Sequence, residues 1–378
     1  MNTITQNLNQ QRNYGIDLLR LFSMYLVVVL HVLGHGGVLS VATGTQYAIS
    51  WLIEIIAYCA VNCFAMISGY VGYTEEERPY HFHKYITLWL QVVFYTFGIT
   101  LLTFVFKPDV VGGKDLIKAF LPVTLDQYWY FTAYTVLFFV IPWLNILIRR
   151  SSEKELNGLM LILFVIFSCY GTFNGYVSTS FHLMGGYSFP WLVLLYLCGA
   201  WMKKCEVPKK IKTGYALAMI IVCVLLTWVV KLFMPIANDI LISYTSPTIV
   251  LIAVLYIVVF SKLKLRKSMH KFVHFLAPAA FGVYLIHEQK IIRNELMNSR
   301  FVWVAEISPM LLPILILSCA AGVFATCLLI EKIRMWLFKA LRINKLINLL
   351  DIYETKVRML LFEKIAHKEN EKGGYDIK

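Results

Sequence analysis

The stretch of residues 15–34, GIDLLRLFSMYLVVVLHVLG, constrains the fold of this chain more than any other segment. A helix that crosses a bilayer needs about 20 mostly apolar residues, and this segment meets that requirement. Hydrophobic residues make up 59% of all 378 positions and charged residues only 15%. A soluble domain of this composition would expose large apolar patches, so the sequence predicts an all-α polytopic membrane protein.

Ten apolar segments are predicted to form one bundle of about ten transmembrane helices. They cover residues 15–34, 46–71, 85–106, 128–148, 156–174, 187–202, 213–234, 246–262, 272–291 and 306–330. This pattern divides the chain into an N-terminal segment at 1–14, a transmembrane domain at 15–331 and an amphipathic tail at 332–378. An even number of crossings places both termini on the same side of the membrane.

Basic residues are distributed unequally between the two sides. Before the tail, the segments on the side of the termini carry sixteen Lys and Arg residues, whereas the opposite side carries six. Because basic loops stay in the cytoplasm, both termini are predicted to be cytoplasmic, with the tail lying on anionic membrane lipid. The formal net charge of +13 is therefore interpreted as a topology signal, and no nucleic-acid partner is predicted.

The first apolar segment also contains Asp17, Arg20 and His31, which are costly inside a membrane and are therefore candidate functional groups. The eleven steps from Arg20 to His31 turn a helix by about 1100°, so both side chains lie on one face. Asp17 can pair with Arg20 three residues later, and His35 continues the polar stripe. The alternative is that Asp17 and Arg20 only anchor the helix at the interface, and that His31 is a hydrogen-bonded core residue.

Several short motifs follow one another along about three hundred residues. They are Arg20 followed by ten residues and His31, FAMISGY at 64–70, Gly185-Gly186 followed by twelve residues and Gly199, FGVYLIH at 281–287, and Glu331. In these motifs and their order the chain resembles the integral membrane acyltransferase family 3. Members of that family transfer acyl groups, usually acetyl from acetyl-CoA, to carbohydrates.

The resemblance implies a cytoplasmic site for the phosphates of CoA at the start of the third span. Family members often carry two arginines three residues apart there, whereas this chain has RPYHFHKYITLW. Arg78, His81 and Lys84 are therefore the candidate donor-binding residues. After Glu331 the family often has Arg and Pro, whereas this chain has Lys and Ile.

Transfer of an acyl group from a thioester to a sugar hydroxyl requires a base, and a neutral imidazole suits this task at neutral pH. His31 is predicted to be this base. Arg20, paired with Asp17, is predicted to hold the head of the donor, because a guanidinium is permanently charged and offers a fork of donors.

Four further side chains are candidates for binding or orienting the acceptor: His35, Glu54, Trp129 and His287. His287 could equally be a helix-end residue bonded to backbone or water. For Trp129 the favoured interpretation is the aromatic belt at the membrane interface, and sugar stacking is the alternative.

Structural roles are predicted for the glycines and for the last of the motif residues. Gly185, Gly186 and Gly199 are expected to permit a tight turn and a close approach of helices. Glu331 is expected to pair with a basic residue.

No metal and no permanently bound cofactor is predicted, and acyl-CoA is expected as a co-substrate. His31 and His35 have the i, i+4 spacing of metal ligands, but no third ligand lies nearby in the sequence. Glu54 or His287 could approach them only through the fold.

The sequence thus predicts a membrane O-acyltransferase that moves an acyl group, acetyl in the first instance, from acyl-CoA to a hydroxyl of a cell-surface or envelope carbohydrate. The predicted location is a bacterial plasma membrane. Two alternatives remain: a transporter or flippase of a lipid-linked saccharide or small anion, and a scaffold without catalysis. Acceptor position, acyl chain, oligomeric state and the choice between direct and covalent transfer stay open.

Overall fold

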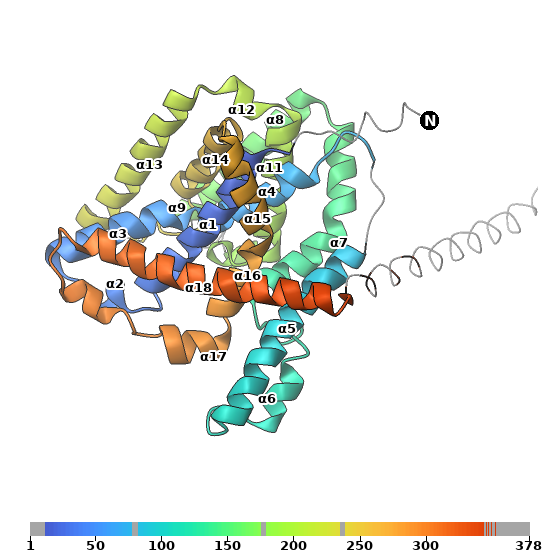
Figure 1. Ribbon diagram of the computed structural model, residues 1–378. Helices are drawn as coiled ribbons and strands as arrows, with labels where there is room; N and C mark the ends of the chain where they lie inside the picture. The colour runs from blue at the N-terminus through green and yellow to red at the C-terminus, as the bar shows by residue number, and fades with distance from the viewer. Residues whose placement is uncertain are drawn as a thin grey trace, which may run out of the picture.

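The computed structural model describes residues 12–77, 82–174, 179–234 and 239–343, together with positions 345, 347, 349 and 352. Within these residues every regular element is helical, which confirms the predicted all-α class (Figure 1). The longer helices are α1 (Tyr14–Leu33), α3 (Gly44–Tyr58), α4 (Ala60–Gly72), α5 (His83–Phe106), α7 (Trp129–Arg150), α8 (Glu153–Leu163), α11 (Phe189–Lys204), α13 (Thr213–Phe233), α14 (Pro247–Ser261), α15 (Lys267–Leu276), α16 (Ala280–His287) and α18 (Leu312–Ala340).

Short helical turns connect these helices. They are α2 (Val38–Val41), α6 (Gly113–Lys118), the π-helix η1 (Phe164–Tyr170), α9 (Gly171–Phe173), η2 (Met184–Gly186), α12 (Val207–Lys210), η4 (Ala277–Ala279), α17 (Lys290–Ile292), η5 (Arg293–Met297) and η6 (Val302–Glu306). α6 lies at the far end of α5, away from the rest of the bundle (Figure 1).

Helix α1 is the hub of the bundle. It contacts α3, α4, α14, α15, α16 and α18, and most of its residues are buried on all sides. Asn13 caps its start by accepting hydrogen bonds from the amides of Gly15 and Ile16, and its side-chain amide donates to the carbonyl of Ser261. The start of α1 is therefore fixed to the end of α14, and polar groups on α1 face other helices.

Within the described part of the chain, eight helices or helix pairs are long and apolar enough to cross a membrane by length and composition. Each of the ten predicted spans contains a helix, but α11 and α14 have only 16 and 15 residues. The multi-pass class is thus confirmed, whereas the number of ten crossings is not.

Three predicted spans are not simple α-helices. The second is divided at Cys59, where α3 ends and α4 begins. The fifth changes from α8 into the π-helix η1, and the ninth is interrupted at Ala277–Ala279, where Pro278 lacks a backbone donor. Hydropathy does not show these interruptions because apolar residues continue on both sides. α18 also continues unbroken past Glu331 to Ala340.

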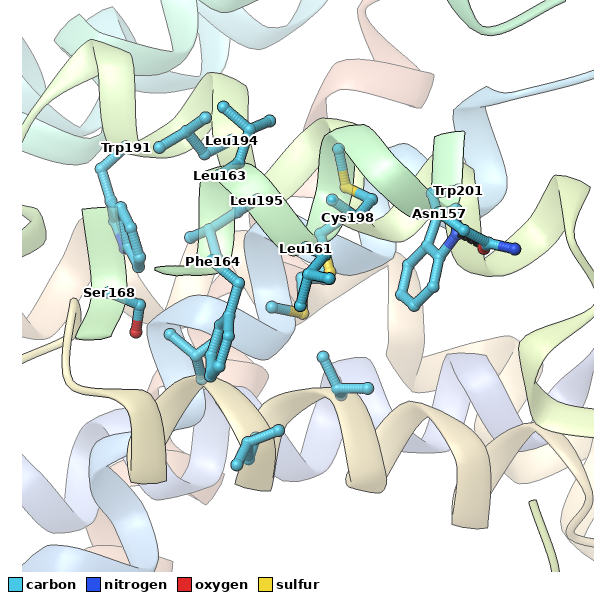
Figure 2. A pocket seen from close by; sticks show the side chains of 15 residues that line it. Asn157, Leu161, Leu163, Phe164, Ser168, Trp191, Leu194, Leu195, Cys198 and Trp201 are labelled. Atoms are coloured by element: carbon cyan, nitrogen blue, oxygen red, sulfur yellow. Dashed lines mark hydrogen bonds between the residues drawn. The ribbon is translucent and has the colours of Figure 1, made fainter. Parts of the chain in front are cut away.

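Close packing of α4 against α11 explains two glycines. A Cβ on Gly199 would overlap the carbonyl of Met66, and a Cβ on Gly69 would overlap the carbonyl of Tyr196. Each glycine therefore allows the backbone of the other helix to approach, as predicted for Gly199. Beside this pair, α8, η1, α11 and α14 enclose an apolar cavity (Figure 2).

Candidate active site

His31, on the last turn of α1, meets His287, the last residue of α16. Nε2 of His287 lies 2.8 Å from Nδ1 of His31, and Nδ1 of His287 lies 2.6 Å from the carbonyl oxygen of Val283. A carbonyl oxygen only accepts hydrogen bonds, so Nδ1 of His287 donates. In a neutral His287, Nε2 is then the acceptor, and Nδ1 of His31 donates to it.

This hydrogen-bond network assigns the tautomer of His31. With its proton on Nδ1, a neutral His31 carries its lone pair on Nε2. Within the described residues no side chain or carbonyl bonds this nitrogen. In this tautomer Nε2 of His31 is able to accept a hydrogen bond or a proton.

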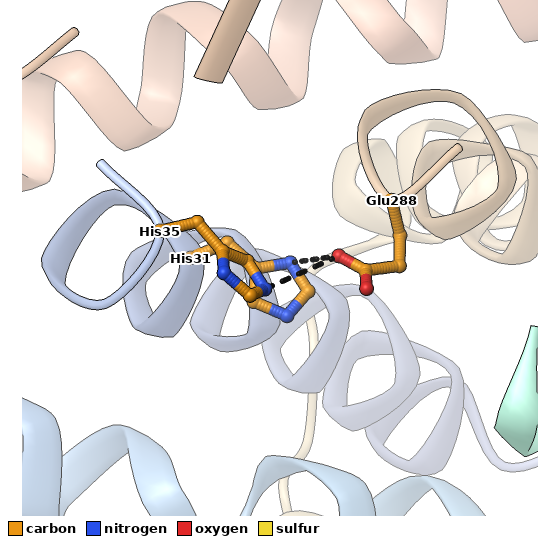
Figure 3. Close-up of side chains that lie close together, drawn as sticks. All are labelled: His31, His35 and Glu288. Atoms are coloured by element: carbon orange, nitrogen blue, oxygen red, sulfur yellow. Dashed lines mark ion pairs between the residues drawn. The ribbon is translucent and has the colours of Figure 1, made fainter. Parts of the chain in front are cut away.

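Glu288 follows His287 directly and approaches the same imidazole (Figure 3). Its Oε2 lies 3.3 Å from Nδ1 of His31 and 3.6 Å from Nε2 of His35. Its Oε1 accepts a hydrogen bond of 2.8 Å from Arg293 on η5. The carboxylate is thus held by an arginine and placed where a positive charge would develop if His31 gained a proton.

The three residues His31, His35 and Glu288 form a group that could hold a metal ion, because one ligand atom of each lies within 4.8 Å of the others. In such a site Glu288 would be the third ligand, which no spacing in the sequence indicates. Nδ1 of His31, however, donates to His287, and Arg293 already balances the carboxylate. The side chains are thus arranged as a hydrogen-bonded set, and the absence of a metal stays a prediction.

A cavity of about 220 Å³ opens beside His31. Besides His31, His35, Glu288 and Arg293, it is lined mainly by apolar and aromatic side chains: Met24, Val27, Val61, Phe64, Trp129, Tyr130, Tyr187, Tyr244, Phe281 and Tyr284. Burial raises the pKa of Tyr244 well above its usual range, so this hydroxyl stays protonated. We call this space the aromatic cavity.

Arg20 lies on the same helix but lines a different cavity. NH1 of Arg20 is 3.2 Å from Oδ1 of Asp17, whose other oxygen pairs with Arg12. The second cavity, of about 460 Å³, also contains the cations Lys84 and Arg149. We call it the basic cavity. The predicted pairing of Asp17 with Arg20 is therefore present, and Lys84 is brought beside Arg20.

Two tyrosines on α7 separate the two cavities. Tyr130 lines the aromatic cavity and Tyr134 lines the basic cavity. Their rings are stacked, with centroids 6.3 Å apart. Arg20 and His31 therefore share one face of α1, but a pair of aromatic rings lies between the spaces that they line.

The remaining acceptor candidates differ in position. Trp129 and His35 line the aromatic cavity, whereas Glu54 lies outside it. Glu54 is buried on α3, and its Oε2 has no hydrogen-bond partner in the described part of the chain. Arg78 and His81 lie outside the described residues, and their role in binding the donor stays a prediction.

The structural candidates occupy two packing sites. Gly185 and Gly186 have φ angles of 64° and 102°, and the carbonyl of Gly185 accepts from the hydroxyl of Ser243. This turn packs the segment before α11 against the segment before α14, and a Cβ on Gly186 would lie 2.5 Å from that of Tyr244. Glycine adopts such φ angles without the strain that a side chain would add.

Glu331 is fully buried in α18 and hydrogen-bonded on both oxygens. Arg334 donates to it at 2.6 and 2.9 Å, and Gln91 and Tyr95 of α5 donate at 3.1 and 2.6 Å. Gly282 of α16 lies against the same carboxyl group. Arg334 is thus the expected basic partner. Through these contacts Glu331 joins α5, α16 and α18, and α16 ends at His287.

Glu288 and Arg293 are the site residues that the sequence analysis missed. Glu288 is adjacent to the motif histidine in YLIHE, and Arg293 follows five residues later. An acidic residue directly after a candidate histidine was the available signal. It could not be interpreted without knowing that α16 packs against α1.

The chain is thus a multi-pass helical membrane protein, and in its described part His31 lines the aromatic cavity with one imidazole nitrogen unpaired. Comparison with known protein families identifies the family of this chain. The acyltransferase domain of acyltransferase family 3 matches residues 13–332, and the chain belongs to this family of membrane acyltransferases. No curated protein and no solved structure matched the chain.

Proposed function

We propose that this membrane acyltransferase transfers an acyl group, acetyl in the simplest case, from acyl-CoA in the basic cavity to a carbohydrate hydroxyl in the aromatic cavity. The observation that carries the proposal is the free Nε2 of His31, whose opposite nitrogen is held by His287. In the proposal His31 is the oriented base, and the aromatic cavity beside it takes the sugar.

The basic cavity supports an anionic donor. Arg20, Lys84 and Arg149 line it together, and Asp17, which also pairs with Arg12, holds the guanidinium of Arg20. Cations of this kind bind phosphates through charge-assisted hydrogen bonds. In the proposal they hold the nucleotide phosphates of CoA, and the pantetheine arm extends along α1 toward His31.

The proposed path of the pantetheine arm along α1 passes the rings of Tyr130 and Tyr134. His31 lies about 16 Å from Arg20 along the helix axis, at a rise of about 1.5 Å per residue. Tyr130 and Tyr134 lie between the two cavities, so the arm displaces or slides past their rings. The hydroxyl of Tyr130 has no hydrogen-bond partner among the described residues, and no such bond has to break when its ring moves.

The aromatic cavity supports a carbohydrate acceptor. Trp129 and Tyr187 lie with ring centroids 4.7 Å apart, and the cavity adds the hydroxyls of Tyr244 and Tyr284. Aromatic faces bind the apolar faces of sugar rings, while hydroxyls and charged groups fix their orientation. The acceptor hydroxyl is expected to point toward Nε2 of His31.

The proposed chemical step needs only His31 and the two substrates for its proton transfers. Nε2 of His31 takes the proton of the acceptor hydroxyl while its oxygen forms a bond to the thioester carbonyl carbon. The carbon–sulfur bond breaks, and the thiolate of CoA leaves with the proton that His31 returns. The imidazolium that exists between these events lies 3.3 Å from the carboxylate of Glu288.

The proposed location is a bacterial plasma membrane with both termini in the cytoplasm, so that the basic cavity faces cytoplasmic acyl-CoA. The amphipathic tail predicted for residues 332–378 would lie on the inner leaflet. The excess of Lys and Arg on the side of the termini supports this orientation.

The experiment uses purified full-length protein in vesicles, with acetyl-CoA labelled in the acetyl group and a panel of envelope glycans. We expect label in one class of glycan. His31→Ala should abolish transfer, whereas His274→Ala, which changes an exposed histidine on α15, should leave it intact.

Two results would contradict the proposal. Substantial transfer by His31→Ala would exclude His31 as the base. Movement of a lipid-linked saccharide across the vesicle membrane without any acylation would favour the transporter alternative instead.

A further inference from the structure

The apolar cavity between α8, η1, α11 and α14 is separate from both cavities described above. It has a volume of about 310 Å³ and is lined by fifteen residues (Figure 2). None of the residues that line it lines the aromatic or the basic cavity. Its purpose is therefore not explained by the proposed transfer reaction.

The lining side chains offer almost no free hydrogen-bonding group to a water molecule. Asn157 accepts a hydrogen bond of 2.7 Å from the indole of Trp201, and Ser168 donates one of 2.6 Å to the carbonyl of Thr245. The other lining side chains are apolar apart from the indole of Trp191, which donates to Asn62. A buried water needs two to four polar partners, so this space favours an apolar occupant.

The cavity is elongated along α11. Trp191 and Ser168 lie at one end, and Trp201 and Asn157 lie at the other (Figure 2). Trp191 and Trp201 are ten residues apart on one helix, which corresponds to about 15 Å. On its outer side, the lining residue Leu161 is 64% exposed, so the cavity opens toward the surroundings of the bundle. A narrow apolar groove of this length fits one extended alkyl chain.

An exposed lysine lies near one end of this groove. Lys154 precedes Asn157 by three residues and so lies on the same face of α8. Lys154 is exposed and has no ion-pair partner among the described residues. The carboxylate of Glu153 beside it is already paired with Lys210 at 3.0 Å. The end at Trp201 and Asn157 therefore attracts a negatively charged group.

We propose that this groove binds one alkyl chain of an anionic phospholipid, with the phosphate of its headgroup beside Lys154. A lipid-linked acceptor fits less well. Its head would have to lie at the opposite end, where Trp191 donates to Asn62 and Asn62 donates to the carbonyl of Tyr244 in the wall of the aromatic cavity. The lining at that end offers no cation for a lipid phosphate.

Binding of a lipid at this place would act on the acceptor site indirectly. Trp191 forms one wall of the groove and, through Asn62, supports Tyr244. An occupied groove therefore keeps α11 and its tryptophan in position without contacting either substrate. The bound lipid would serve as a structural component of the enzyme.

The test uses the full chain, reconstituted in phosphatidylcholine vesicles that contain a minor fraction of phosphatidylglycerol. The protein is extracted again, washed until bulk lipid is removed and analysed by native mass spectrometry. We expect one retained phosphatidylglycerol per chain. Cys198→Trp, which fills the groove, should remove it, whereas Leu217→Trp, on the exposed face of α13, should not.

The headgroup contact is tested separately. Lys154→Gln should lower the preference for phosphatidylglycerol over phosphatidylcholine by about fivefold, the usual contribution of one basic residue near a membrane surface. Lys114→Gln, which changes an exposed lysine on α6, should leave the preference unchanged. If Cys198→Trp does not fold, Leu251→Phe on the α14 wall fills the same groove.

Three results would overturn the proposal. They are a washed protein that retains no lipid or only detergent, equal retention of phosphatidylcholine by the unchanged protein, and retention of phosphatidylglycerol by a folded groove-filling variant. Loss of lipid with acyl transfer intact would leave the proposed function standing. Loss of acyl transfer in His31→Ala with lipid retained would leave this proposal standing.

Discussion

Replacement of Glu288 by Gln tests whether the carboxylate acts in catalysis. Two unit charges 3.3 Å apart, the separation of Oε2 from Nδ1 of His31, interact by about 5 kcal/mol at an effective dielectric constant of 20. Arg293 is bonded to the other oxygen and offsets part of this energy. The net contribution should therefore approach that of a hydrogen bond to a charged group, about 1.5–3 kcal/mol.

This energy is gained only when His31 carries the acceptor proton, so it lowers the barrier without strengthening substrate binding. Glu288→Gln should thus reduce kcat by about 10- to 150-fold, since about 1.4 kcal/mol corresponds to a factor of ten. KM for the acceptor should change little, because Gln has nearly the same shape. Steady-state acetyl transfer in vesicles, with both substrates varied, separates the two constants.

Glu295→Gln is the matched control. Glu295 lies on η5 close to Arg293, but its carboxylate is partly exposed and pairs at 3.5 Å with Lys107. Its replacement should leave kcat within about twofold. An unchanged kcat in Glu288→Gln would show that the carboxylate does not stabilise a charged His31. A rise in KM alone would assign it to acceptor binding.

Three further variants test the other parts of the site. Arg20→Gln should raise KM for acyl-CoA by about 10- to 150-fold, while Arg150→Gln, outside the basic cavity, should not; equal effects would contradict a donor site at Arg20. His287→Ala should lower kcat by about 2- to 10-fold through loss of one hydrogen bond, and an unchanged rate would exclude its orienting role. Gly199→Ala should destabilise the protein by about 1–3 kcal/mol in thermal unfolding. Gly158→Ala, in open space, should stabilise it by up to about 1 kcal/mol. Equal shifts in the two variants would contradict close packing of α4 against α11.

The helices were predictable from the sequence because lipid leaves few alternatives. A backbone inside a bilayer must satisfy its own hydrogen bonds, so each long apolar run becomes a helix. The break at Cys59 and the π-helix at Phe164–Tyr170 were not predictable, because neither changes the hydropathy of its segment. Both depend on how neighbouring helices pack.

The site was predictable only along a single helix. The shared face of Arg20 and His31 follows from the helical repeat alone, and so does the pairing of Arg20 with Asp17. The contact of His31 with His287 joins residues 256 positions apart, and no local pattern specifies it. For the same reason the sequence could not show that the tyrosine pair divides one expected path into two cavities.

Arg20 and His31 project from the same rigid rod, so the protein cannot adjust the gap between them to suit a different donor. Under the proposed mechanism, the fixed spacing along α1 selects donors in which the distance from the phosphates to the reactive carbonyl matches the distance from Arg20 to His31. A carrier with a shorter arm would leave the carbonyl below His31, however tightly its phosphates were held. Under the same mechanism the acyl group beyond the carbonyl would lie in the aromatic cavity, so the carrier and the acyl group would be selected at two different places.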